Sequence, residues 1–307
     1  MADSATVEAA RRALGPVGVM LPNVPFAPQP TVAEQRAAVT RWEQAGHTTV
    51  WTNEGVGGKD AFTQLAILLA ATERMTFAAG VLNMWARPPE TAHGAATYLA
   101  QAFPGRFVAG FGIGYPFQAE TVGREYRRPA ASARHYLERL REVPPITPAL
   151  DAPYAAILAA NGARMLDVAR EAADGAIPTV QPPAFTAEAR AVLGPEKILV
   201  VGLPVVLDED RDAARAEARR FLTGVLAGGD SPYAANLVRL GLPERAVREV
   251  ADEVVEAVVA FGTPEDVARE VRAHHAAGAD HVRLSVTAAD FATGVAQLEQ
   301  LAGATRT

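Results

Sequence analysis

The sequence contains no cysteine. This absence excludes disulfide bonds, thiolate metal ligands and a cysteine nucleophile. A chain without disulfides suits a reducing compartment, so we expect a cytoplasmic protein. The sequence also lacks the run of about 18 uncharged apolar residues that a membrane-spanning helix needs, so we expect no membrane partner.

Basic charge is also scarce. Lysine and arginine number 29 against 35 aspartate and glutamate residues, which gives a net charge of −6 and a pI near 5.6. Proteins that bind nucleic acid usually carry a basic face, so we expect a small-molecule substrate and no nucleic-acid partner. No histidine, aspartate and glutamate cluster has metal-ligand spacing, so no metal site is expected. The sequence contains no Gly-x-Ser-x-Gly motif, and no dinucleotide-binding Gly-x-Gly-x-x-Gly motif follows the first strand.

What the sequence does contain is a repeated unit of an amphipathic helix, a glycine and a short strand. Residues 31–34, Thr-Val-Ala-Glu, have the pattern of a capping box, and the helix that they start is predicted to end at Gly46. Residues 263–266, Thr-Pro-Glu-Asp, start a similar helix that ends at Gly278. Helices that alternate with short strands predict βαβ units and a parallel sheet.

The strand count predicts the fold class. Eight parallel strands close more naturally into a (β/α)8 TIM barrel than into an open sheet, and single barrels reach 307 residues. We therefore predict one domain over residues 1–307, with insertions after strands four and seven. The first insertion holds Pro144–Pro148, and the second holds helical segments over Asp208–Ala227 and Glu244–Ala260 on either side of a loop, Gly228–Pro232. The predicted strands are Val17–Leu21, Thr48–Thr52, Thr76–Leu82, Arg106–Gly112, Tyr154–Ala160, Ala176–Thr179, Ile198–Leu207 and Val282–Thr287.

Barrel enzymes build the active site at the carboxyl ends of their strands. Strand four is followed by Gly112-Ile113-Gly114, whose glycines let a ligand approach the backbone. Strand five is followed by Asn161–Arg164 at the start of a helix, where free N–H groups and an arginine suit a phosphate. Glycines at strand ends are often plain turns, but the two segments together favour a phosphate-bearing cofactor.

Several segments resemble the bacterial luciferase-like family. Met75–Pro88 is similar to the third strand and loop of that family, and Phe103–Gly114 is similar to its Pro-Gly-Arg-Phe stretch. Ala160–Leu166 with Ala173–Ala176 is similar to its fifth-strand motif, and Ala277–Val282 is similar to its last unit. These matches follow the family order over roughly residues 15–290.

The resemblance implies an oxidoreductase that binds coenzyme F420, with FMN as the alternative cofactor. It also implies that the cofactor ring lies over Gly80 and Val81, which a non-prolyl cis peptide would join. The cofactor-binding residues implied in this way are Gly80, Val81, Asn83, Gly112, Ile113, Gly114, Ala160, Asn161, Gly162 and Arg164.

The resemblance places Asn53, Glu54 and Tyr115 at catalytic positions, and Trp85 and Arg87 are candidates for substrate contact. Many family members carry a histidine after strand two or strand four, and this chain does not. Glu54 is then the candidate proton donor or acceptor, provided that burial raises its pKa. The alternative is that Glu54 is a capping or salt-bridge acid, Tyr115 covers the site, and Trp85 and Arg87 pack at the barrel rim.

Three functions stay open from the sequence. The first is hydride transfer between reduced F420 and a small organic substrate. The second is an FMN-dependent monooxygenase supplied by a separate reductase, and the third is a barrel that binds flavin without catalysis. A flavin or F420 reductase is a further possible partner. Family members usually pair through helices near strands two and three, and the apolar helix predicted over Ala61–Thr72 favours a homodimer.

Overall fold

The computed structural model describes residues 2–23, 28–142, 152–227 and 231–304. The predicted segment Pro144–Pro148 and residues 228–230 of the predicted loop lie outside the described residues. The strands are β1 (Val17–Met20), β2 (Thr49–Asn53), β3 (Thr76–Asn83), β4 (Phe107–Gly112), β5 (Ala156–Ala159), β6 (Gly175–Ile177), β7 (Ile198–Leu207), β8 (Ala260–Gly262) and β9 (His281–Val286). The helices are α1 (Ser4–Leu14), α2 (Val32–Ala45), α3 (Ala61–Ala70), α4 (Pro89–Ala102), α5 (Pro116–Thr121), α6 (Pro129–Arg139), α7 (Ala163–Ala172), α8 (Pro183–Leu193), α9 (Arg211–Leu226), α10 (Pro232–Arg239), α11 (Glu244–Glu249), α12 (Asp252–Val258), α13 (Pro264–Ala276) and α14 (Phe291–Ala304).

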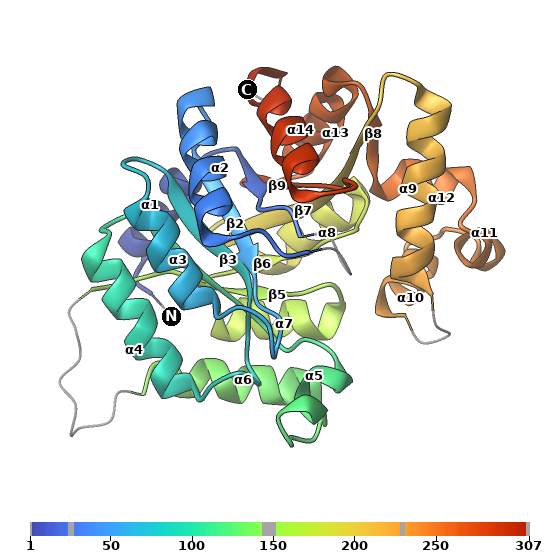
Figure 1. Ribbon diagram of the computed structural model, residues 1–307. Helices are drawn as coiled ribbons and strands as arrows, with labels where there is room; N and C mark the ends of the chain where they lie inside the picture. The colour runs from blue at the N-terminus through green and yellow to red at the C-terminus, as the bar shows by residue number, and fades with distance from the viewer. Residues whose placement is uncertain (1, 24–27, 143–151, 228–230, 305–307) are drawn as a thin grey trace. The chain divides into compact units, whose positions relative to one another are not determined.

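The strands form a closed sheet. Their order is β6-β5-β4-β3-β2-β1-β9-β7-β8, and β6 also pairs with β7 (Figure 1). The predicted (β/α)8 barrel is confirmed, with α5 and α6 inserted after β4 and α9 to α12 inserted after β7. Each predicted barrel strand is present, and β8 is an additional short strand that pairs with the carboxyl end of β7. In the described part of the chain, no helix is both long enough and apolar enough to span a membrane.

Two helix starts form as the sequence predicts. The side chain of Thr31 accepts from the backbone N–H of Glu34, whose carboxylate accepts from the N–H of Thr31, and Gly46 ends α2 in the left-handed region. Thr263 and Asp266 make the same reciprocal pair at the start of α13. The hydrogen bonds from Thr263 lower the pKa of Asp266 to about 2. Each pair satisfies N–H groups that the first turn of a helix leaves without partners.

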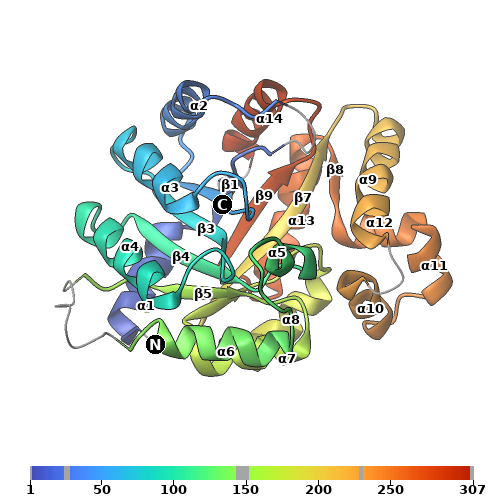
Figure 2. The same cartoon turned by 60° about the horizontal axis from the view of Figure 1, so that its bottom comes forward.

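The contacts divide the chain into two compact units. The first comprises Met1–Gly15, Thr48–Ile177 and Val192–Ile198, and therefore contains β2 to β6. Figure 2 shows α4 and α6 outside the strands of this unit. The single domain predicted for residues 1–307 stays a prediction.

The motif around Asp174 joins segments of the first unit that are far apart in sequence. The side chain of Asp174 is 1% exposed and accepts from the backbone N–H groups of Ala2 and Ala156, both at 2.8 Å. It also accepts from the guanidinium of Arg141 at 3.2 Å. These donors compensate the cost of burying the carboxylate, so this motif anchors the chain start to β5.

The second unit comprises Pro16–His47, Pro178–Ala191 and Leu199–Thr307. Its insertion after β7 differs from the prediction of one helical segment over Glu244–Ala260. The segment contains two short helices, α11 and α12, separated at Val250 with φ 50°, and it ends in β8. The helix α10 was not predicted. Valines of α12, including Val254 and Val255, pack on α9 in one apolar cluster.

Gly110 lets β4 approach its neighbours in the first unit. A Cβ atom at Gly110 would lie 1.9 Å from the carbonyl oxygen of Ala79 and 3.0 Å from a side-chain carbon of Ile177. Gly94, in α4, is exposed, and a Cβ atom there would meet nothing within 4 Å.

We expect Gly110→Ala to lower the free energy of unfolding by about 3 kcal/mol, because the backbone oxygen cannot move aside without disturbing β3. The control Gly94→Ala should raise the free energy of unfolding by about 0.5–1 kcal/mol, because alanine is the better helix former. Urea denaturation of the two variants measures both effects. Equal stability of Gly110→Ala and the parent chain would contradict this strand packing.

Candidate active site

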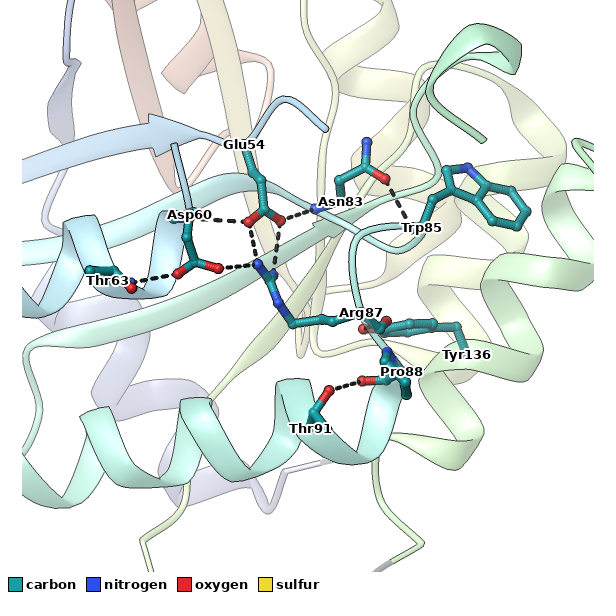
Figure 3. A network of polar contacts seen from close by, with 10 residues as sticks. Glu54, Asp60, Thr63, Asn83, Trp85, Arg87, Pro88, Thr91 and Tyr136 are labelled. Atoms are coloured by element: carbon teal, nitrogen blue, oxygen red, sulfur yellow. Dashed lines mark hydrogen bonds and ion pairs between the residues drawn. The ribbon is translucent and has the colours of Figure 1, made fainter. Parts of the chain in front are cut away.

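The loop that follows β3 is held by one buried carboxylate. Glu54, directly after β2, is 6% exposed and accepts from the backbone N–H of Asn83 at 2.9 Å and from that of Ala61 at 3.2 Å. Its own N–H donates to the carbonyl of Val81 at 2.8 Å. Glu54 therefore connects the end of β2, the end of β3 and the start of α3, as Figure 3 shows in part.

Arg87 completes the surroundings of this carboxylate. Its two terminal nitrogens donate to the two carboxylate oxygens of Glu54, one of them at 2.9 Å, in a bidentate ion pair. The guanidinium also donates to Asp60 at 2.6 Å and lies 5.0 Å from the ring centroid of Phe62. Burial lowers the pKa of Arg87, but hydrogen bonds and charges of Glu54 and Asp60 outweigh burial and raise it.

Four N–H groups donate to the carboxylate of Glu54, and this affects its predicted role as a proton donor or acceptor. Two backbone N–H groups and a bidentate guanidinium occupy its two carboxylate oxygens. The geometry therefore favours a positioning role, in which Glu54 holds the loop from Asn83 to Arg87. Proton transfer by Glu54 stays a prediction. Arg87, predicted to contact substrate, directs its guanidinium at Glu54 and Asp60 instead of standing free.

Asp60 was not predicted as part of the site. It caps α3 by accepting from the N–H of Thr63 at 2.8 Å while its other oxygen accepts from Arg87. Burial raises the pKa of Asp60, but the hydrogen bonds from Thr63 and Arg87 outweigh burial and lower it. The signal was present in the sequence, because an aspartate before an apolar helical run is a typical cap.

Asn83 ends β3 with an unused donor. Its side chain is 1% exposed, and its Oδ1 accepts from the N–H of Trp85 at 2.9 Å. Its buried Nδ2 has no hydrogen-bond partner among the described residues. Figure 3 shows this nitrogen pointing away from Glu54 and Arg87. Since a buried polar group without a partner is costly, Nδ2 is suited to an acceptor atom of a ligand.

The predicted segment after β4 lies beside Asn83. Gly114 has φ +60°, and a Cβ atom there would lie 2.8 Å from Asn83 Nδ2. A Cβ atom at Gly112 would lie 2.9 Å from a side-chain carbon of Val81 and 3.4 Å from Ala159. Neither position has room for a side chain, because Val81 and Ala159 pack against Gly112, and Gln118 and Asn83 pack against Gly114.

Three consecutive carbonyls of this segment already accept hydrogen bonds. The carbonyl of Gly112 accepts from the N–H of Met84 at 3.1 Å, and that of Ile113 accepts from the indole of Trp85 at 2.6 Å. The carbonyl of Gly114 accepts from the hydroxyl of Tyr126 at 3.2 Å. Trp85 and Tyr126 also contact each other, with ring centroids 6.0 Å apart. No sequence signal pointed to Tyr126, because its role depends on the path of the loop after α5.

Tyr115 and Phe117 form an exposed aromatic pair after β4. Their rings stack with centroids 6.0 Å apart, and they are 46% and 62% exposed. Burial, together with the nearby phenol of Tyr115, raises the pKa of Tyr126. Tyr115 is thus an exposed side chain after β4, and its catalytic role and the alternative covering role both stay predictions.

The segment after β5 has the predicted helix start. Gly162 is the first cap position of α7, no side chain caps that position, and Arg164 is exposed in the first turn. Ala160 is buried and donates its N–H to the carbonyl of Ile177 at 3.2 Å, while Asn161 is half-buried. The free first turn and the adjacent arginine suit a phosphate.

The end of β3 differs from one prediction. Every peptide bond of the described residues is trans, so the cis bond predicted between Gly80 and Val81 is wrong. The irregularity expected there takes another form, because β3 carries an extra residue relative to β2 between Ala79 and Val81. Gly80 is the extra residue of this bulge. Beyond it, the exposed Asn53 of β2 pairs with the half-buried Val81 of β3.

The residues present fit a cofactor that has a planar polar ring and a phosphate. The buried, unused Nδ2 of Asn83, beside the closely packed Gly112–Gly114 segment, suits a polar atom of the ring. The uncapped start of α7 with Arg164 suits the phosphate. These groups all belong to the first compact unit.

Comparisons with known proteins give the family context. The sequence profile described as luciferase-like monooxygenase matches residues 16–281. The chain is 26% identical to a Mycobacterium tuberculosis protein named as a coenzyme F420-dependent oxidoreductase, over 84% of this chain and 91% of that protein. It is 23% identical to the 5,10-methylenetetrahydromethanopterin reductase of Archaeoglobus fulgidus, over 85% of this chain and 91% of the relative.

Solved structures share the fold. An F420-dependent secondary alcohol dehydrogenase in complex with an F420-acetone adduct matches with a TM-score of 0.73 and 16% identity, covering 95% of this chain and 99% of that one. The oxygenating constituent of 3,6-diketocamphane monooxygenase from Pseudomonas putida, in complex with FMN, matches with a TM-score of 0.67 and 14% identity, covering 95% and 98%.

The ion pair of Glu54 and Arg87 yields a stability prediction. We expect Arg87→Met to lower the free energy of unfolding by about 3–5 kcal/mol, because Glu54 would stay buried without its cation. The double variant Arg87→Met/Glu54→Gln should regain part of that loss, because no buried charge is then left unpaired. Urea denaturation of both variants and of Glu54→Gln gives the double-mutant cycle. If the two single changes in the free energy of unfolding simply add up in the double variant, Glu54 and Arg87 do not stabilise each other, which would contradict the prediction.

Proposed function

Because the chain belongs to the luciferase-like monooxygenase family, we propose that it transfers a hydride between reduced coenzyme F420 and a small organic substrate. One relative supports F420 over FMN, since it is named for that coenzyme. The single observation in this chain that carries the proposal is the buried, unused Nδ2 of Asn83 beside Gly112 and Gly114.

In this proposal, the cofactor-binding residues act at two places. The N–H groups at the start of α7 and the guanidinium of Arg164 hold the phosphate. Asn83 Nδ2 donates to a polar atom of the ring, against Gly80, Val81 and the Gly112–Gly114 segment. When bound, the deazaflavin supplies the hydride chemistry, and the protein supplies orientation and electrostatics.

The remaining residues of the site exclude water and fix the loop. Trp85 is held by hydrogen bonds of its backbone and its indole, so it offers a fixed wall for a substrate. Tyr115 with Phe117 offers an exposed aromatic cover. Glu54 and Arg87 keep Asn83 and Trp85 in place, because they connect both ends of that loop. A dry, fixed surface favours hydride transfer because the donor and acceptor carbons must lie close together.

FMN-dependent monooxygenation is the second candidate. The fold shared with an FMN-bound monooxygenase component favours it, and such an enzyme would depend on a separate reductase. The same phosphate and ring contacts would serve FMN. The two candidates are therefore distinguished by measuring the affinity of the protein for each cofactor.

Cofactor binding tests the proposal. We expect F420 to quench the protein fluorescence with an affinity at least about tenfold above that of FMN, which corresponds to about 1.4 kcal/mol. Arg164→Ala should weaken F420 binding about tenfold, because a charge-assisted contact to phosphate is lost. The matched control Arg170→Ala, near the end of the same helix, should bind normally. Tighter binding of FMN would favour the monooxygenase, and binding of neither cofactor would overturn both candidates.

We also propose that the chain forms a homodimer through α3. Leu65, Leu68 and Leu69 are already buried within the chain, but Ala66 and Ile67 remain half-buried on a helix with few polar side chains. An apolar helix face that stays accessible suits a partner surface. The cytoplasmic location stays a prediction.

Light scattering tests the assembly. We expect a mass of about twice 32.3 kDa at micromolar concentration, and a monomeric mass for Ile67→Arg, because a charge at the interface would be buried without a partner. A monomeric mass for the parent chain would contradict the homodimer.

A further inference from the structure

Tyr126, in the connection between α5 and α6, contacts two parts of the candidate site at once. The side chain is half-buried, and its hydroxyl donates to the carbonyl of Gly114 at 3.2 Å. Its ring also contacts the ring of Trp85, with centroids 6.0 Å apart. Gly114 follows β4 and Trp85 follows β3, so this one side chain joins the loops at the ends of two neighbouring strands.

The helix α6 determines the place from which Tyr126 reaches these loops. Arg128 has φ 43°, a left-handed conformation that residues other than glycine rarely adopt, and α6 starts at the next residue. Within α6, Tyr136 is 8% exposed, contacts the ring of Phe111 in β4 and donates its hydroxyl to the carbonyl of Arg87 at 3.3 Å. The helix is therefore anchored on β4 and on the loop after β3, and it holds Tyr126 next to both.

The contact with Trp85 affects the amide of Asn83. The backbone N–H of Trp85 can only donate, so Asn83 must turn its Oδ1 toward that group, at 2.9 Å. The Nδ2 of the amide then points away as the buried donor that has no hydrogen-bond partner among the described residues. If Trp85 were displaced, the amide could turn and present its oxygen where the proposed site needs a donor.

The contact with Gly114 affects the same donor. A Cβ atom at Gly114 would lie 2.8 Å from Nδ2 of Asn83, so the backbone of Gly114 and this nitrogen are close neighbours. The hydroxyl of Tyr126 holds the carbonyl of Gly114 in place. Burial, together with the nearby phenol of Tyr115, raises the pKa of Tyr126, so the hydroxyl keeps its proton and donates at neutral pH.

From these contacts we propose that Tyr126 is a positioning residue of the cofactor site, which keeps Nδ2 of Asn83 directed at the cofactor ring by holding Trp85 and Gly114. The inference rests on the proposed function for the presence of that ring. Tyr126 acts through these two residues and contributes no atom to the reaction. Tyr126, Trp85, Gly114 and Asn83 all belong to the first compact unit.

Cofactor binding by matched variants tests the proposal. Tyr126→Phe keeps the ring and removes the hydroxyl, and Tyr126→Leu removes both contacts. We expect the affinity for F420, measured by calorimetric titration, to fall about threefold in Tyr126→Phe and about tenfold in Tyr126→Leu. The control Tyr154→Phe removes a hydroxyl that contacts His93 at 3.1 Å in the same unit, and it should bind F420 normally. Unchanged affinity in both Tyr126 variants would overturn the proposal.

Two further measurements distinguish positioning from a general loss of stability. In a Trp85→Leu background, Tyr126→Leu should weaken F420 binding only about threefold, because only the contact with Gly114 is then left to lose. An undiminished tenfold effect would show that Tyr126 does not act through Trp85. At saturating F420, the circular dichroism in the absorption band of the cofactor should change in Tyr126→Leu and stay the same in Tyr154→Phe. A variant that is only less stable would bind the ring in the same orientation once folded, so an unchanged spectrum would count against the proposal.

The fluorescence of the free protein separates this inference from the proposed function. Trp42 and Trp51 are fully buried and Trp85 is half-buried, so acrylamide quenches mainly the fluorescence of Trp85. Quenching should increase in Tyr126→Leu and stay the same in Tyr154→Phe. Equal quenching in Tyr126→Leu and the parent chain would overturn the inference whichever cofactor binds.

The choice of cofactor has its own outcome. If the parent chain binds FMN and not F420, the proposed hydride transfer from F420 fails. The same Tyr126 variants are then titrated with FMN, and a loss of FMN affinity would support the positioning role independently. Binding of neither cofactor by the parent chain would overturn both the proposed function and this inference.

Discussion

The burial of one carboxylate governs the arrangement of the first compact unit. Glu54 accepts hydrogen bonds from two backbone N–H groups and a guanidinium, and these donors come from two stretches of chain, the start of α3 and the loop after β3. Removing a partner would leave a charge in a poorly solvated place, so the end of β3 has little freedom to move. The positions of Asn83 and Trp85 follow from that constraint.

The order of elements could be predicted because local signals agree with the fold. The capping pair of Thr31 and Glu34 and the glycine that ends α2 mark boundaries without reference to the rest of the chain. The break at Val250 and the short strand β8 could not be predicted in this way. Val250 adopts a conformation that its own side chain disfavours, and β8 exists because β7 extends far enough to pair with it.

The candidate site shows the same division. The glycines after β4 and the helix start after β5 could be found, because the residue types carry the chemistry. The salt-bridge role of Glu54 could be given as an alternative but not chosen, because its partner is distant in sequence. The contacts of Arg87 and Tyr126 could not be found for the same reason. A carboxylate after a strand has the same local pattern whether it transfers a proton or anchors a loop.

The hydrogen-bond donors to the three carbonyls after β4 have a consequence for the polarity of that segment. Met84, Trp85 and Tyr126 occupy the carbonyls of Gly112, Ile113 and Gly114 in turn. One lone pair of each carbonyl is thereby engaged, which weakens the repulsion of an electron-rich guest, while the amide of Asn83 stays available beside them. The main-chain and indole donors at this segment are thus already used, so a guest that presents an acceptor atom meets the amide of Asn83.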